Sequence, residues 1–162
     1  MTPTDIAPTE ITTGDIDWIY ALNKKHEVEL SPLTRDGVIS MVDRATYARA
    51  IDGGAFLLGF DQDGDYDSPN FIWHRDRFDR FLYVDRIAVA ATHRRRGLAV
   101  KLYNDIFSFA EARSDERIVC EVNSDPPNPA SDAFHKALGF EVVGEAYLGD
   151  RGKTVRYLAK EL

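Results

Sequence analysis

One stretch of the chain, residues 81–113, constrains the fold more than any other. It opens with FLYVDRIAV, whose β-branched and aromatic residues are typical of a strand. It continues with LAVKLYNDIFSFAEAR, where apolar residues recur at the spacing of one helix face: Leu98, Leu102, Ile106 and Ala110. A basic turn containing Gly97 lies between strand and helix. We expect this turn to bind phosphate, because the first N–H groups of a helix lack partners within the helix and the helix dipole favours an anion.

Composition and charge limit the classes of protein that fit this sequence. A chain of 162 residues with 44% hydrophobic and 29% charged residues is typical of one globular domain, which we expect to span residues 1–162. No apolar run has the length of a membrane span and the N-terminus lacks a signal-peptide pattern, so we expect a cytoplasmic protein without a membrane partner. The net charge of −7 argues against general binding to nucleic acid.

The other segments follow helix or strand patterns in turn. Before the central strand, the sequence predicts a short strand near Ile6, a helix over 16–26 capped by Asp15, a helix over 34–45 capped by Thr34, and hairpin strands over 47–51 and 55–60. After the long helix, it predicts a strand over 117–122, a helix over 131–138 ended by Gly139, and hairpin strands over 141–147 and 154–159. This order predicts a mixed α/β sheet of about seven strands with helices on both faces.

Residues 61–80 read as a long polar connection between two strands. Its alternating aspartates, Asp61 to Asp67, suggest a calcium loop, but Gly64 falls at the wrong place and no glutamate closes the loop. A solvated loop tip is therefore the expected structure. The aromatic second part, residues 70–78, is a candidate wall of a substrate pocket, with simple surface packing as the alternative.

Two motifs resemble the GNAT superfamily of acyl-CoA N-acyltransferases. Residues 94–99, with Arg94, Gly97 and Ala99, fit the pattern Gln/Arg-x-x-Gly-x-Gly/Ala of that family's motif A. Downstream, Asn128 precedes a short helix that leads into Leu-Gly-Phe at 138–140, which is a second family feature. The two motifs cover roughly the C-terminal half of the chain, and the predicted order of helices and strands is also the family's.

The resemblance implies acetyl-CoA as co-substrate. Its pyrophosphate would lie on backbone N–H groups of the motif A turn, where a Cβ on Gly97 would crowd the phosphate or strain the backbone. Its pantetheine would pair with the edge of the central strand, which a bulge separates from its neighbour, and an N–H there would stabilise the oxyanion. The residues implied in binding are Ile87, Ala88, Val89, Arg94, Arg95, Arg96, Gly97, Leu98, Ala99 and Asn128.

Three side chains are candidates for proton transfer. Asp85 on the central strand is the first candidate for a general base, and Glu121 on the next strand is the second. Each could instead pair with a cation, which for Asp85 would be Arg86. His135 occupies the position of the family's usual tyrosine, which protonates the leaving CoA thiolate. A histidine, with an ordinary pKa of about 6.5, could donate that proton, could only hydrogen-bond the sulfur, or could be a helix-surface residue.

The leading hypothesis is an N-acetyltransferase that moves an acetyl group from acetyl-CoA to a primary amine by direct attack. The acceptor is a small molecule or a protein amine. The alternative is an acyl-CoA-binding regulatory or interaction module, which the missing tyrosine favours. The four histidines are scattered and no His/Cys pair has metal-ligand spacing, so we expect no metal. The single cysteine, Cys120, is expected to be buried and unreactive. A homodimer is implied only because many members of the family are dimers.

Overall fold

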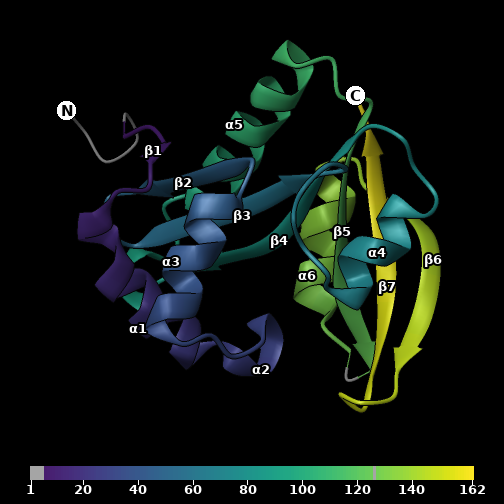
Figure 1. The fold of residues 1–162 in the computed structure, drawn as a ribbon, viewed down its shortest axis with the longest axis horizontal. Coiled ribbons are helices and arrows are strands. Elements are labelled where there is room, and N and C mark those ends of the chain that lie inside the picture. Colours follow the sequence, from purple (N-terminus) through teal and green to yellow (C-terminus); the bar gives the residue numbers. More distant parts are fainter. Residues whose placement is uncertain (1–5, 126) are drawn as a thin grey trace.

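The computed structural model describes residues 6–125 and 127–162 and contains one seven-stranded mixed sheet (Figure 1). The strand order is β1-β2-β3-β4-β5-β7-β6, with β4 and β5 parallel and the other pairs antiparallel. The strands are β1 (Thr9–Glu10), β2 (Tyr47–Ile51), β3 (Ala55–Asp61), β4 (Phe81–Val89), β5 (Arg117–Asp125), β6 (Glu141–Leu148) and β7 (Lys153–Glu161). The first strand thus begins at Thr9, a few residues beyond the predicted position near Ile6.

Helices cover both faces of the sheet, as the sequence predicts (Figure 1). They are α1 (Ile16–Lys25), α2 (Glu27–Leu30), α3 (Arg35–Arg44), α4 (Pro69–Arg75), α5 (Leu98–Ala112) and α6 (Pro129–Ala137), with 3₁₀ turns η2 (Thr13–Asp15) and η3 (Ala91–His93). The α1, α3 and α4 helices pack on one face, while α5 packs on the other with α6 beside it. No helix in the described ranges is long and apolar enough to cross a membrane.

The alternation of side chains along β4 creates two hydrophobic cores. Phe81 and Tyr83 point toward α1, α3 and α4, whereas Leu82 and Val84 point toward α5. The apolar face of α5 fills the second core through the residues predicted from its spacing, Leu98, Leu102, Ile106 and Ala110, together with Tyr103. The predicted strand–turn–helix unit is therefore the centre of the fold.

Two local predictions need correction and a third is confirmed. The segment 61–80 is not wholly a loop, because α4 forms within it and buries Phe71 and His74 against the sheet. The Asp15 side chain does not cap α1; it accepts hydrogen bonds from the Thr12 N–H and the Trp18 indole. The predicted cap of α3 is confirmed, since the Thr34 hydroxyl accepts a hydrogen bond from the Gly37 N–H at 2.9 Å.

The parallel strands β4 and β5 are joined only at their first three residues. Pairing runs from Phe81 with Arg117 to Tyr83 with Val119, and within the described ranges no pair joins the strands beyond that point. On its other side, β4 contains a bulge, because Val84 and Arg86 face the consecutive residues Gly59 and Leu58 of β3. Asp85 is the extra residue. The second half of β4 therefore presents an unpaired edge toward β5, as the family resemblance implies.

Candidate active site

A cavity of about 740 Å³ lies where β4 and β5 diverge. Residues 83–89 of β4 line one side and residues 120–123 of β5 the other, while α2, α3, the start of α4, α6 and the β6–β7 turn complete the walls. The cavity brings together seven of the site residues predicted from sequence: Asp85, Ile87, Ala88, Val89, Glu121, Asn128 and His135. Residues 94–99 do not line it.

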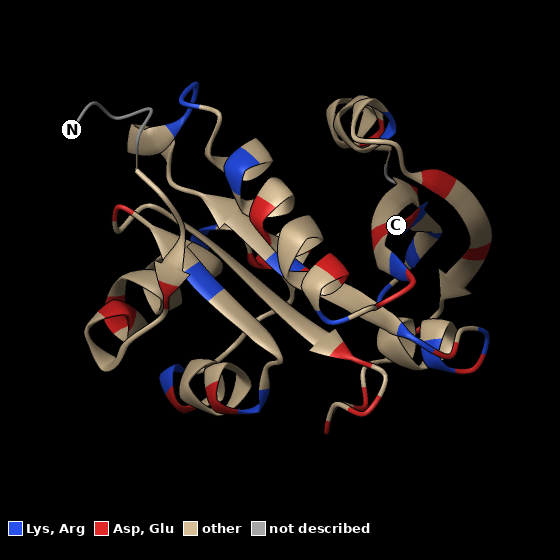
Figure 2. Cartoon of the chain, turned by 90° about the horizontal axis from the view of Figure 1, so that it is seen from above, with Lys and Arg blue, Asp and Glu red and all other residues tan. Residues whose placement is uncertain are grey.

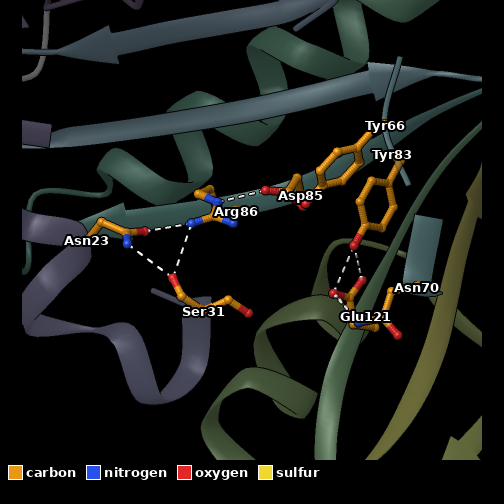
Figure 3. A network of polar contacts seen from close by, with 8 residues as sticks. All are labelled: Asn23, Ser31, Tyr66, Asn70, Tyr83, Asp85, Arg86 and Glu121. Atoms are coloured by element: carbon orange, nitrogen blue, oxygen red, sulfur yellow. Dashed lines mark hydrogen bonds and ion pairs between the residues drawn. The ribbon is translucent and has the colours of Figure 1, made fainter. Parts of the chain in front are cut away.

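Glu121 has the most strongly perturbed carboxyl group in the cavity. The Tyr83 hydroxyl lies 2.9 and 2.8 Å from its two oxygens, and the Asn70 amide donates to Oε1 at 3.0 Å (Figure 3). The Tyr157 hydroxyl in turn donates to Asn70 Oδ1 at 2.9 Å, which fixes the amide orientation. Burial raises the pKa of Glu121 to about 8, and the hydrogen bond from Tyr83 opposes that rise. Such a group exchanges a proton near neutral pH.

Asp85 has a different environment although it also lines the cavity. Its Oδ2 accepts a hydrogen bond from Arg86 Nε at 2.7 Å, and its Oδ1 accepts one from the Tyr66 hydroxyl at 2.5 Å (Figure 3). Both charged side chains of the pair are only 4% exposed. Arg86 Nη1 continues the network to Asn23 Oδ1 and to the Ser31 carbonyl. This chain of contacts ties β4 to the segment between α1 and α3.

His135 is held at both ring nitrogens. Nδ1 lies 2.7 Å from the Ser131 carbonyl oxygen and Nε2 lies 2.9 Å from the Tyr103 hydroxyl. A carbonyl only accepts, so the neutral ring carries its proton on Nδ1, and Nε2 accepts the proton of Tyr103. Burial lowers the pKa of His135, which keeps the ring neutral at pH 7. The histidine predicted to be an acid is therefore an acceptor in this arrangement.

The basic turn before α5 has the geometry of an anion site. Gly97 caps the helix with φ of +69°, a left-handed conformation that suits glycine, and a Cβ built there would meet no atom within 4 Å. Figure 2 shows this turn as a short run of Lys and Arg ahead of α5. Of its arginines, Arg96 pairs with Asp52 at 3.4 Å. The open turn leaves room for a phosphate at the start of the helix.

Asn128 caps α6 and also lines the cavity. As the cap of α6, its Oδ1 accepts a hydrogen bond from the Ser131 N–H at 3.2 Å. It also lines the cavity, so its amide nitrogen remains available to a bound molecule. In the predicted wall formed by residues 70–78, only Asn70 reaches the cavity.

Sequence reasoning missed four tyrosines that organise the site. Tyr83 and Tyr157 act around Glu121, Tyr66 binds Asp85 and Tyr103 binds His135. Each occupies an apolar position in its strand, helix or loop, where a tyrosine reads as core. A buried hydroxyl nevertheless needs a hydrogen-bond partner, and that requirement is the signal that could have linked them to the charged residues.

Comparison with solved structures shows the same fold in several acetyltransferases. NAA60 of Arabidopsis thaliana, solved with acetyl-CoA, has a TM-score of 0.74 and 14% identity, over 97% of this chain and 99% of that chain. Ard1 of Thermoplasma volcanium has a TM-score of 0.74 and 15% identity, over 97% of both chains. The ribosomal-protein-S18-alanine N-acetyltransferase of Escherichia coli has a TM-score of 0.68 and 17% identity, over 96% and 93%.

Sequence comparison adds the family. No curated protein sequence matches the chain. The profile of the Acetyltransferase (GNAT) family, in contrast, matches residues 56–140, a region that contains β3 to β5, α4 to α6 and the basic turn. This region is more than half of the chain and includes the diverging strands, the bulge and Glu121. By sequence profile and by fold, the chain belongs to the GNAT acetyltransferase family.

Proposed function

We propose that the protein is an N-acetyltransferase that moves an acetyl group from acetyl-CoA to a primary amine by direct attack. The observation that carries this proposal is Glu121, a carboxyl group with a pKa raised by burial to about 8, in the cavity beside the unpaired edge of β4. A base of this kind suits removal of a proton from an amine near neutral pH.

The free edge and the basic turn fit the two ends of acetyl-CoA. Residues 87–89 of β4 pair with β3 on one side and have no described strand partner toward β5, so the N–H and C=O groups that point toward β5 are free to pair with the pantetheine amides. The N–H groups of residues 95–99 and the charges of Arg94 and Arg95 would hold the phosphates. Asn128 would contact the pantetheine from the opposite side. The co-substrate supplies an activated acetyl group as its thioester.

We assign the residues of the cavity the following roles in acetyl transfer. Glu121 accepts the proton that the attacking amine loses, directly or through water, while Tyr83 and Asn70 hold its carboxylate in place. An N–H of residues 87–89 donates to the developing oxyanion. Tyr103 and His135 line the cavity but supply no proton to the sulfur in this arrangement, since the Tyr103 hydroxyl donates to His135 Nε2 and the His135 Nδ1–H donates to the Ser131 carbonyl. The CoA would leave as its thiolate and take a proton from water.

Asp85 remains the alternative base, but its geometry favours a structural role. Both of its oxygens are engaged, one by Arg86 and one by Tyr66. Removing a proton from an amine would break one of these contacts and leave a buried arginine without its partner. We therefore assign Asp85 to positioning β4 and the segment above the cavity, and Glu121 to proton transfer.

The proposal is tested by measuring CoA thiol release from acetyl-CoA across a panel of amines. We expect release with one class of amine and none with Gly97→Glu, whose carboxylate would occupy the phosphate site. Gly97→Ala is the matched control, because it imposes the same strain at positive φ and adds only an uncharged methyl group, and it should retain more activity than Gly97→Glu. Unchanged acetyl-CoA affinity in Gly97→Glu would contradict the phosphate site.

A binding module remains the second candidate, because the family's usual tyrosine is replaced by His135. Protein that binds acetyl-CoA by calorimetry and releases no thiol with any amine would favour this candidate. His135→Ala separates the two functions. A large fall in turnover with intact acetyl-CoA affinity requires an enzyme, whereas a module would show no turnover to lose.

A further inference from the structure

One basic side chain of the cavity has no partner among the described residues. Five basic residues line the cavity: His26, Arg44, Arg86, Arg151 and Lys153. Arg86 is paired with Asp85, Arg44 donates to the Asp65 carbonyl, Lys153 donates to the Val28 carbonyl, and His26 lies 3.9 Å from Glu29. Only the guanidinium of Arg151 makes no hydrogen bond or ion pair within residues 6–125 and 127–162. All its N–H donors are therefore available to a bound molecule.

The turn between β6 and β7 holds Arg151 at the cavity. The Arg151 N–H donates to the Leu148 carbonyl at 3.0 Å, which closes the turn. Two residues later, the Lys153 ammonium donates to the Val28 carbonyl in α2, and this contact fastens β7 to the opposite wall (Figure 1). Arg151 and Glu121 both line the cavity, and the charge of Arg151 acts against the rise that burial causes in the pKa of Glu121.

The cavity is also lined by acidic residues, of which two are paired with a basic side chain. Four of them line it: Glu29, Asp67, Asp85 and Glu121. Asp85 is neutralised by Arg86, and Glu29 lies beside His26. Asp67 is exposed, without a described partner, and would attract an incoming ammonium group. The groups left for a bound molecule are thus two acidic side chains, Asp67 and Glu121, and the Arg151 guanidinium, which together match a molecule that carries an amine and a carboxylate.

We propose that the acceptor is an α-amino acid, whose amine lies at Glu121 while its carboxylate binds Arg151. This proposal rests on the acetyltransferase function proposed above. A guanidinium binds a carboxylate through two parallel hydrogen bonds, which also fixes the orientation of the molecule. Glu121 lies where β4 and β5 diverge, so an amine held by it would lie beside the unpaired edge of β4. A polyamine would instead bring a second positive charge toward Arg151, which disfavours that class.

The test measures binding of a panel of L-α-amino acids and of the matched L-α-amino acid amides, which lack only the carboxylate charge. Calorimetry is performed on the protein saturated with CoA, and thiol release from acetyl-CoA is measured for the same compounds. We expect at least one free acid to bind at least tenfold more tightly than its amide. Arg151→Gln should remove this preference, and Arg151→Lys should retain part of it. Lys24→Gln, an exposed charge change outside the cavity, is the matched control.

Equal affinity for acids and amides, or a preference that survives in Arg151→Gln, would overturn the proposal. Thiol release with amides and not with acids would also overturn it, while leaving the proposed acetyltransferase function intact. A further outcome would support the acceptor class and contradict the acetyltransferase function. Arg151-dependent binding of free acids without any thiol release would support the acceptor class and contradict the enzymatic function.

Discussion

At the scale of single residues, the site depends on two carboxylates that the fold treats differently. Asp85 is buried as one half of an ion pair, so its charge is balanced inside the protein. Glu121 has no cationic hydrogen-bond partner; it is held by a hydroxyl and an amide, and burial raises its pKa to about 8. Asp85 thus has a fixed cationic partner, whereas Glu121 has a proton that can be exchanged near neutral pH.

This contrast predicts different effects for two conservative substitutions. Glu121→Gln should lower kcat/KM at pH 8 by roughly 10²-fold or more while acetyl-CoA affinity is kept. In the native protein kcat/KM should rise with pH and level off above a pKa of about 8, because Glu121 must lose its proton to act as the base. The variant should retain only the rise that reflects ionisation of the amine substrate.

Asp85→Asn is the matched comparison. It should lower the free energy of unfolding by roughly 3 kcal/mol, because it leaves the buried Arg86 without its counter-charge. The pH dependence of turnover by the remaining folded protein should keep the Glu121 transition. Urea unfolding and pH-rate profiles of both variants measure these effects. A profile flattened by Asp85→Asn and unchanged by Glu121→Gln would reverse the two assignments.

At the scale of elements, α4 is the part of the site that sequence patterns conceal. It packs on β5 through His74, whose Nε2 lies 3.2 Å from the Cys120 carbonyl oxygen and therefore carries the proton. Nδ1 of the same ring is buried without a partner among the described residues. A second proton would have to be placed on this atom, away from water. Burial accordingly lowers the pKa of His74 to about 4.

The docking of α4 should therefore weaken in acid. Between pH 6.5 and about 4, the unfolded chain binds a proton at His74 that the folded chain does not. The free energy of unfolding therefore decreases as the pH is lowered through this window. Between pH 7 and pH 5 the loss from this residue is roughly 2 kcal/mol. His74→Gln can keep the hydrogen bond to Cys120 and does not titrate. Urea unfolding at both pH values should show a smaller loss for the variant, and an equal loss would contradict the role of His74.

The sequence predicts the elements well where periodicity is long and less well where the chain turns. The spacing of Leu98 to Ala110 predicts α5 closely, and Gly97 marks its start because of its positive φ. Helix α4 is only seven residues long and follows an aspartate-rich loop, so no helical period could be recognised. The contacts of Asn70 with Glu121 and with Tyr157 join residues far apart in the chain, and no local pattern encodes them.

At the scale of the whole molecule, the sheet consists of two parts that meet at a short seam. Strands β1 to β4 form one part and β5 to β7 the other, and three residue pairs of β4 and β5 join them. Beyond this seam the parts are bridged by side chains, such as Tyr83 to Glu121 (Figure 3) and Lys153 to the Val28 carbonyl. A ligand that pairs with β4 and also contacts α6 would join both parts and add stabilising contacts on each.

Acetyl-CoA should consequently raise the melting temperature of the whole molecule. At a ligand concentration of about 100 times Kd, binding to the folded state alone adds about 2.7 kcal/mol to the free energy of unfolding. For a domain of this size that corresponds to an increase of roughly 5–10 °C in Tm. Differential scanning calorimetry with increasing acetyl-CoA measures the effect, and Gly97→Glu should shift little at the same concentrations. An equal shift in that variant would place the stabilising contacts away from the basic turn.

Because ion pairs with phosphate weaken in salt, the shift in the native protein should also decrease as ionic strength rises.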